Sequence, residues 1–514
     1  MIKRLDNIKL SIARPESDLL KVVQKKVGGQ VKYFRILKKS LDARDKGNIF
    51  WQYSVAYSFD KEKEAPKEYE KIKSSPRVAV IGGGPAGLFC AVRLIEHGFK
   101  PIIIERGETV EDRRNTCLKF FDGGELSEES NVQFGEGGAG AFSDGKLNTR
   151  TKDGLNADVL SLFYKFGAPE DILYLNKPHV GSDRLFGVLQ NIRAYILQNG
   201  GEYAFNTKLT GIVTDGEKLT ALKLKRVGKS DEQILEVDAA VLAIGHSARD
   251  TFEMLSKSGV YMEPREFAVG VRVEHLSKEI SFSQYGQSYK LLPAADYQLV
   301  SHAHERTVFT FCMCPGGVVI PAASEKGGVV VNGMSLRARD GVNSNSALMV
   351  QMRREDFGSD DLFAGMRFQR SLEERAFTIG GSNHKAPVQL YGDFAADKLS
   401  QNFKEILPTY AAGTSFAPLN KVLPKVAVDA LKAAMPDFGK RLKGFDTYSA
   451  LMTGVETRFS SPVKIVRDSS LQSVSVKNLY PCGEGSGYSG GITSSAADGL
   501  KIAEILFERF NNLQ

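Results

Sequence analysis

The amino-acid sequence predicts an α/β protein with several domains, and three observations lead to that fold class. Its 514 residues are enough for two or three domains. Between residues 77 and 105, an apolar strand pattern, a glycine-rich turn, an apolar helix pattern and a second strand pattern follow one another. After residue 447, the succession of strand, glycine-rich loop and helix returns. We therefore expect a parallel-sheet domain interrupted by an inserted α+β domain.

Changes in composition divide the chain into four segments. Residues 1–73 are predicted to form a small α/β domain that ends in a charged, proline-containing linker. Residues 74–263 form the first part of the parallel-sheet domain, and residues 447–514 form its C-terminal part. Residues 264–446 lack any nucleotide-binding signature, and we expect them to form an inserted substrate domain.

The first glycine-rich turn has the spacing G-x-G-x-x-G, and each glycine has a physical reason. Gly82 permits a tight turn after the strand, Gly84 lets the backbone approach a pyrophosphate, and Gly87 lets the helix pack on the strand. The helix begins with unpaired N–H groups and a positive dipole end that favour phosphate. Glu105, at the end of the second strand, can accept hydrogen bonds from ribose hydroxyls. The pattern predicts a Rossmann-type dinucleotide-binding domain.

The remainder of the chain favours FAD over NAD as that dinucleotide. A nicotinamide dehydrogenase usually continues with further βα units, whereas this chain continues with a loop region, several short strands and a distant glycine motif. In that motif Gly483-Glu484 follow a strand, and a helix begins near Gly491 that could face the flavin pyrimidine ring. Two other stretches match G-x-G-x-x-G without a complete βαβ unit. NADH or NADPH could therefore bind only transiently, as an electron donor against the flavin.

Several motifs resemble a bacterial family of FAD-dependent dehydrogenases with the glutathione-reductase-type FAD fold. They are residues 80–87, Glu105-Arg106, residues 131–147, residues 243–250, the segment FCMCPGG at 311–317, residues 454–458 and the segment GEGSGYSGG at 483–491. The likeness covers nearly the whole chain and implies the cofactor, but leaves the substrate open. More distantly, the chain is similar to flavoproteins that reduce unsaturated small molecules. The resemblance implies FAD contacts at Gly82, Gly84, Pro85, Ala86, Gly87, Glu105, Arg106, Gly137, Gly138, Ala139, Gly140, Lys146, Leu209, Ala243, Gly245, Gly483, Glu484, Gly491 and Ile492.

Four side chains are candidates for the chemistry. Cys312 and Cys314 form a C-x-C pair that is either a redox dithiol exchanging electrons with the flavin or the end of a strand. Arg458 either holds a substrate carboxylate or reduced flavin, or pairs with Glu456 or another acid. His246 is an acid–base group or a structural histidine. No second cysteine or histidine pair has zinc-site spacing, so we expect no metal.

Net charge and cysteine content indicate the cellular compartment and the kinds of partner that the chain favours. The net charge of +7 is small for this length, but lysines and arginines are concentrated between residues 21 and 46. Five cysteines, an odd and sparse set, favour a reducing cytoplasm. The sequence shows neither a signal-peptide pattern nor an apolar run of membrane-spanning length.

The expected function is therefore that of an FAD-dependent dehydrogenase or reductase. It would transfer a hydride between flavin N5 and a small organic substrate, such as an unsaturated or carbonyl-conjugated compound. An alternative is an RNA-associated flavoprotein that docks nucleic acid through its basic N-terminal domain. A slow flavin-dependent redox sensor is a further alternative.

Overall fold

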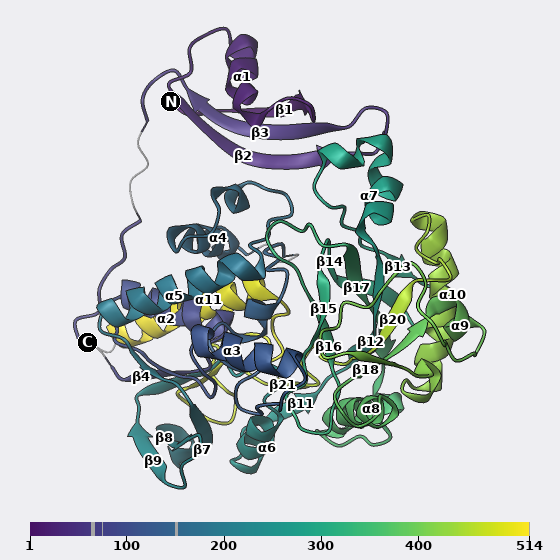
Figure 1. The fold of residues 1–514 in the computed structure, drawn as a ribbon. Coiled ribbons are helices and arrows are strands. Elements are labelled where there is room, and N and C mark those ends of the chain that lie inside the picture. The colour runs from purple at the N-terminus through teal and green to yellow at the C-terminus, as the bar shows by residue number, and fades with distance from the viewer. Residues whose placement is uncertain (63–66, 75, 150–152, 513–514) are drawn as a thin grey trace.

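The computed structural model describes residues 1–62, 67–74, 76–149 and 153–512. Three bodies are visible: a small N-terminal unit, a body built on a parallel sheet, and a body built on a large, mainly antiparallel sheet (Figure 1). Within the described residues, none of the helices is both long enough and apolar enough to cross a membrane.

A five-stranded parallel sheet forms the centre of the first large body. Its strand order is β22-β10-β4-β5-β6, so the C-terminal strand β22 lies at the edge beside β10, a strand from the first half of the chain. The strands are β4 (Val78–Ile81), β5 (Ile102–Ile104), β6 (Glu202–Ala204), β10 (Ala239–Leu242) and β22 (Leu479–Pro481). Every residue of β4 and β10 is buried, as expected for parallel strands covered on both faces. The predicted βαβ unit and Rossmann-type fold are confirmed.

Helices cover one face of the parallel sheet, and a second small sheet covers the other. The helices are α2 (Pro85–Glu96), α3 (Val110–Phe121), α4 (Leu155–Lys165), α5 (Ser182–Gln198) and α11 (Ile492–Asn511). The opposite face packs against the antiparallel meander β7 (Thr207–Asp215), β8 (Lys218–Arg226) and β9 (Glu232–Glu236), together with α6 (Arg249–Lys257). Helices α2 and α11 are in close contact, because a Cβ at Gly499 would lie 2.0 Å from the Ala86 carbonyl oxygen.

A seven-stranded sheet of order β13-β14-β17-β12-β20-β18-β19 forms the second large body. Its strands are β12 (Phe267–Leu276), β13 (Val300–Ser301), β14 (Val308–Cys314), β17 (Asn343–Met352), β18 (Ala386–Leu390), β19 (Thr414–Phe416) and β20 (Leu451–Glu456). The helices of this body are α7 (Ser277–Tyr285), α8 (Ala364–Ile379), α9 (Tyr391–Ala395) and α10 (Lys425–Arg441), and its hairpin is β15 (Val318–Pro321) with β16 (Val331–Met334).

The position of β20 corrects the predicted boundary between residues 446 and 447. This strand pairs with β12 and β18 of the seven-stranded sheet, so the second body extends through residue 456. A buried strand pattern does not show which of two sheets the strand joins, and the sequence therefore could not place β20. Strands β11 (Met262–Pro264) and β21 (Val463–Ile465) then pair with each other at the two crossings between the bodies.

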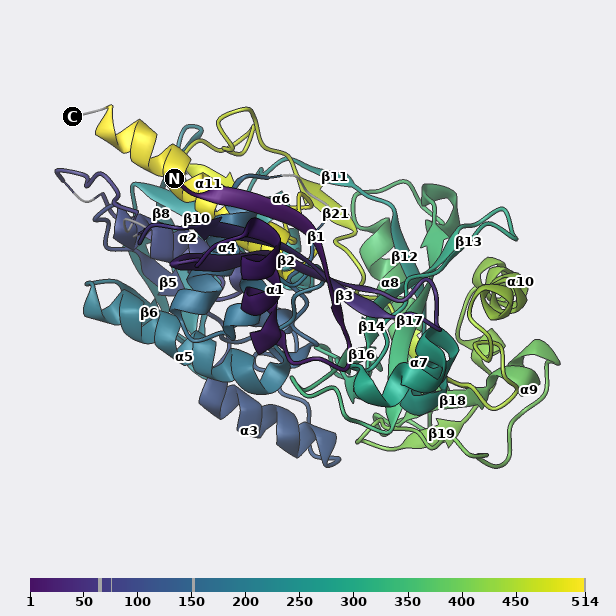
Figure 2. The ribbon, with the colours of Figure 1, turned by 90° about the horizontal axis from the view of Figure 1, so that it is seen from above.

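The N-terminal unit is an antiparallel sheet of order β1-β3-β2 with one helix packed on it. Its elements are β1 (Lys3–Ser11), α1 (Leu19–Val27), β2 (Tyr33–Asp42) and β3 (Phe50–Ser58). It spans both large bodies when seen from above (Figure 2). The Lys39 backbone N–H donates to the Tyr174 carbonyl (2.7 Å), and Lys46 Nζ donates to the Ser283 carbonyl (2.7 Å).

The basic residues of the N-terminal unit do not share one face. Lys21, Lys25 and Lys26 lie on α1, whereas Arg35 and Lys38 lie on the face of the sheet away from that helix. On the same outer face Arg4 pairs with Asp6. The RNA-binding alternative stays a prediction from composition.

Candidate cofactor site

Two helix N-termini and one glycine-rich loop meet above the carboxyl ends of β4 and β22. Gly84 precedes α2, and Gly491 precedes α11. The Gly137 N–H donates to the Gly83 carbonyl (2.7 Å), which holds the loop against the start of α2. On the other side of this loop, a Cβ at Gly140 would contact Ile492 at 3.1 Å. Residues 82–87, 137–140, 243–246 and 483–492, which these contacts bring together, are here called the glycine groove.

Protein packing explains some glycines of the groove but leaves others unexplained. A Cβ at Gly82 would lie 2.2 Å from the Ala243 carbonyl oxygen, and one at Gly87 would lie 2.0 Å from the Gly82 carbonyl oxygen. Gly84 is different, because its φ of −81° suits any residue and its nearest described neighbour would be Gly138 Cα at 3.8 Å. A Cβ at Gly245 would have no described atom within 4 Å, although its φ of +72° by itself favours glycine. Open space at such positions fits a bound ligand that approaches the backbone.

The Glu105 carboxylate binds three loops together beside the start of α2. It accepts the N–H groups of Gly83 (2.6 Å), Gly107 (2.9 Å) and Gly135 (3.0 Å). An ionised carboxylate has about four acceptor positions, so one is not used by these three N–H groups. Arg106, in contrast, is occupied: its guanidinium pairs with Glu129 and Asp250 and lies 4.1 Å from the Phe134 ring centroid.

The opposite end of the groove combines two predicted residues that are distant in sequence. His246 Nδ1 lies 3.4 Å from Glu484 Oε1, and His246 Nε2 is buried without a hydrogen-bond partner among the described residues. The two loops are in direct contact, because a Cβ at Gly485 would lie 2.5 Å from the Gly245 carbonyl oxygen. An unpaired buried nitrogen at this edge fits a ligand that supplies the missing partner.

The remaining predicted cofactor residues lie at different depths. Pro85, Ala86, Gly138, Ala139 and Gly483 belong to the groove itself, and Ala243 lies directly beneath Gly82. Leu209 is buried on β7, opposite Leu224. Lys146 ends the glycine-rich loop, where its Nζ pairs with Asp144 (2.7 Å) and donates to the Met313 carbonyl of the second body.

Arg458 has an acid partner that differs from the named sequence alternative, Glu456. Its Nε and Nη2 donate to the two carboxylate oxygens of Glu373 (2.9 and 3.0 Å), which Arg249 also binds from the other side (2.9 and 2.8 Å). Burial raises the pKa of Glu373, but the charges of Arg249 and Arg458 outweigh burial and lower it to about 2. Arg249, Glu373 and Arg458, here called the Glu373 cluster, join α6, α8 and the segment after β20.

Sequence reasoning missed Arg272, which is the partner of Glu456. The fully buried guanidinium of Arg272 pairs with Glu456 (3.1 Å) and with the Asn345 side chain (2.6 Å). Its Nη2 also donates to the carbonyl of Cys312 (2.9 Å). The only sequence signal was that Arg272 lies between two valines on β12. That pattern is equally typical of a strand whose charged residues face the solvent.

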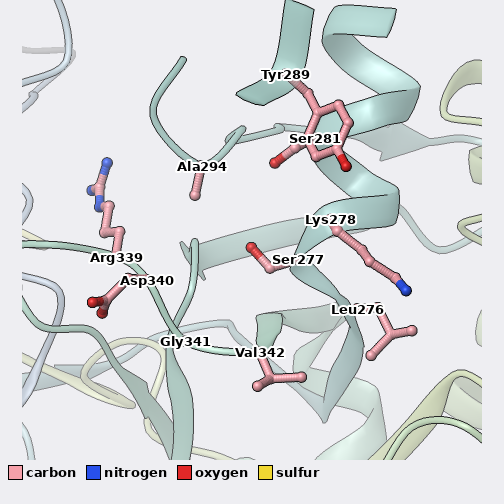
Figure 3. Close-up of a pocket in the computed structure, with 10 residues that line it drawn as sticks. All are labelled: Leu276, Ser277, Lys278, Ser281, Tyr289, Ala294, Arg339, Asp340, Gly341 and Val342. Atoms are coloured by element: carbon pink, nitrogen blue, oxygen red, sulfur yellow. The ribbon is translucent and has the colours of Figure 1, made fainter. Parts of the chain in front are cut away.

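Two cavities lie outside the glycine groove. One, of about 350 Å³, opens at the start of α7 and is lined by Leu276, Ser277, Lys278, Ser281, Tyr289, Ala294, Arg339, Asp340, Gly341 and Val342 (Figure 3). The other, of about 420 Å³, lies between α3 and α5. Neither is lined by a residue predicted from the sequence to bind the cofactor or to carry the chemistry.

Replacement of Glu373 by Gln should destabilise the protein by about 3–5 kcal/mol, because two buried arginines lose their shared counter-charge. The measurement is urea unfolding followed by circular dichroism. The folded pKa of Glu373 is depressed to about 2, so its stabilising contribution is complete above an unfolded pKa of about 4.3 and is lost as the pH falls toward 2. The Glu373→Gln variant should therefore lack the part of the acid-induced destabilisation that comes from protonation of Glu373.

The matched control is Glu325→Gln, since Glu325 binds the same Arg249 but its side chain is 29% exposed. We expect a cost of about 1 kcal/mol or less for this partly exposed pair. Equal costs for both variants would contradict the role assigned to the Glu373 cluster.

Comparison with known proteins agrees with this division of the chain. Residues 76–254 match the pyridine nucleotide-disulphide oxidoreductase family, residues 266–459 match the FAD-dependent protein C-terminal domain-like family, and residues 1–58 match a domain of unknown function. Among solved structures, a geranylgeranyl bacteriochlorophyll reductase-like protein from Thermoplasma acidophilum is 10% identical, with a TM-score of 0.39 over 85% of this chain and 79% of that one. The quinol fumarate reductase subunit FrdA of E. coli is 11% identical, with a TM-score of 0.37 over 86% and 71%. Neither structure bears on the substrate.

A protein of Clostridium beijerinckii named only "Uncharacterized protein" is 46% identical over 540 residues, covering 99% of both chains. That protein gives no substrate or reaction. It does fix the relationship, because the alignment includes the N-terminal unit and both large bodies. The chain belongs to the family of this Clostridium protein, and it combines a pyridine nucleotide-disulphide oxidoreductase FAD domain with an FAD-dependent protein C-terminal domain.

Proposed function

We propose that the chain is an oxidoreductase that binds FAD in the glycine groove and transfers a hydride to or from a small organic molecule. The observation that carries this proposal is the convergence of two helix N-termini on glycines with no packing reason of their own. Unpaired backbone N–H groups and two positive dipole ends favour an anionic ligand there. When bound, FAD would supply hydride chemistry at its N5 atom.

The residues of the groove have distinct tasks in this proposal. The N–H groups at the start of α2 bind the pyrophosphate, and Glu105 accepts a ribose hydroxyl at its remaining acceptor position. The N–H groups after Gly491 would stabilise negative charge on the flavin. His246 is the candidate for holding or moving a proton, because its Nε2 is the buried nitrogen without a described partner at the groove edge.

The substrate would lie on the aromatic face of the seven-stranded sheet, formed by Phe309, Phe311 and Phe459. Phe459 contacts the other two rings edge-on, at centroid distances of 5.3 and 4.5 Å, and Phe311 is 37% exposed. Close to Phe459 in the chain, Ser461 Oγ donates to the Gly485 carbonyl (3.3 Å), so the segment after Phe459 contacts the C-terminal glycine motif. An apolar aromatic surface suits an unsaturated or carbonyl-conjugated molecule. The guanidinium of Arg458 binds the Glu373 carboxylate, so we do not propose that it holds the substrate.

Replacement of Gly84 by Ala should lower the affinity for FAD at least about tenfold while leaving the melting temperature of the cofactor-free chain unchanged. The added methyl group meets no crowded protein atoms but occupies the space reserved for the pyrophosphate. The measurements are titration of the cofactor-free chain with FAD and thermal unfolding without it.

Gly82→Ala is the contrasting variant, because its Cβ would collide with the Ala243 carbonyl at a φ of +108°. We expect it to destabilise the cofactor-free chain itself. Wild-type FAD affinity in Gly84→Ala would show that the pyrophosphate lies elsewhere.

An anaerobic titration with NADH and NADPH tests the reaction. We expect one of them to bleach the flavin absorbance, and an unsaturated carbonyl compound to restore it without oxygen. Such restoration would identify the direction as reduction of an organic acceptor. The contrary result is a flavin that dithionite reduces, but that neither NADH nor NADPH reduces and no organic substrate reduces or reoxidises. That result would contradict the proposed enzyme and favour a redox sensor.

A further inference from the structure

Cys312 and Cys314 lie on an irregular strand end that brings their side chains together. The pairing of β14 with β17 shifts between Phe311 and Cys314, which marks a bulge, and Cys312 has a φ of +43°. At this bulge Cys314 Sγ donates to the Cys312 backbone carbonyl (3.2 Å), and the two thiols lie near enough for each to shift the pKa of the other. Both cysteines are free thiols in this structure, Cys312 partly exposed and Cys314 buried.

Two cations surround this pair of thiols. Arg272 Nη2 lies 3.6 Å from Cys314 Sγ and donates to the Cys312 carbonyl, and Lys146 donates to the intervening Met313 carbonyl. The neighbouring Cys312 thiol and the charges of Arg272 and Lys146 oppose burial and lower the pKa of Cys314 to about 7, whereas the contact with Cys314 and burial raise the pKa of Cys312. The pair can therefore hold one negative charge near neutral pH, which is the condition for thiol–disulfide exchange.

The other three cysteines lack these conditions. Cys90, Cys117 and Cys482 are buried, and burial raises the pKa of each thiol. For Cys117 the pKa rises to about 11 even though Arg113 lies nearby. Reactivity toward disulfides should therefore be confined to the C-x-C pair.

We propose that Cys312 and Cys314 are a redox-active dithiol that closes to an intramolecular disulfide by exchange with a small-molecule disulfide. The partly exposed Cys312 gives its proton to the Cys314 thiolate as its sulfur attacks one sulfur of the incoming disulfide, which forms a mixed disulfide and releases one thiolate. Cys314 passes that proton to the released thiolate, attacks Cys312 Sγ and releases the second thiolate, which takes a proton from water. One external disulfide is thus reduced as one internal disulfide forms. This step is independent of the proposed hydride transfer.

The test equilibrates the full-length protein, with its cofactor as purified, in anaerobic glutathione buffers of increasing oxidised fraction. Free thiols are then alkylated after acid quenching, and peptides are identified by mass spectrometry. The peptide with Cys312 and Cys314 should lose both alkylation sites together and become lighter by two hydrogen atoms. Cys314→Ser should instead stop at one glutathionyl group on Cys312. Cys90, Cys117 and Cys482 are internal controls and should stay alkylatable.

The role of Lys146 is tested by the pH dependence of alkylation at Cys312 and Cys314. Lys146→Met should move the apparent pKa of the pair upward by about one unit, and Lys146→Arg should restore it, because the positive charge is the feature that matters. Independent alkylation of both cysteines in fully oxidised buffer, or a wild-type protein that stops at the glutathione adduct, would overturn the proposal. An unshifted pH profile in Lys146→Met would overturn the part assigned to the charge.

Discussion

The close packing of α2 on α11 is the constraint on which the rest of the structure depends. Gly87 allows α2 to approach β4, and Gly499 allows α11 to approach α2. Helices from opposite ends of the chain thereby direct their N-termini into the same groove. Each N-terminus carries about half a positive charge and unpaired N–H groups, and each favours an anion by about 0.3–2 kcal/mol depending on burial. The fold thus creates a place for a phosphate-containing cofactor before any side chain contributes.

The second body is held against this groove by buried charge. Arg249 begins α6 shortly after the open Gly245, and Glu373 joins it to Arg458 beyond β20. Lys146 makes a second link, from the glycine-rich loop to the end of β14. A buried carboxylate shared by two arginines is specific in geometry, because losing either partner leaves a charge uncompensated. Through Lys146, the end of β14 that carries the C-x-C pair contacts the glycine-rich loop.

Local patterns predicted the parts of the fold that depend on neighbouring residues. The succession of strand, Gly82–Gly87 and helix needs only short-range geometry, and the same holds for the helix after Gly491. Long-range pairing was beyond the sequence. It could not show that β20 joins the seven-stranded sheet, nor that Arg458 binds Glu373 rather than Glu456. The sequence also could not show which cations lie near Cys314. They come from β12 and from the glycine-rich loop, both far from Cys314 along the chain.

The central claim is that the glycine groove binds FAD through its pyrophosphate and adenosine half as well as through its flavin. The most direct measurement is calorimetric titration of the cofactor-free chain with FAD and, separately, with FMN, which has the same flavin but lacks the adenosine and the second phosphate. The account predicts one FAD per chain and binding of FMN weaker by about 100-fold or more, equivalent to about 2.8 kcal/mol. Equal affinity for the two flavins, or binding of neither, would contradict it.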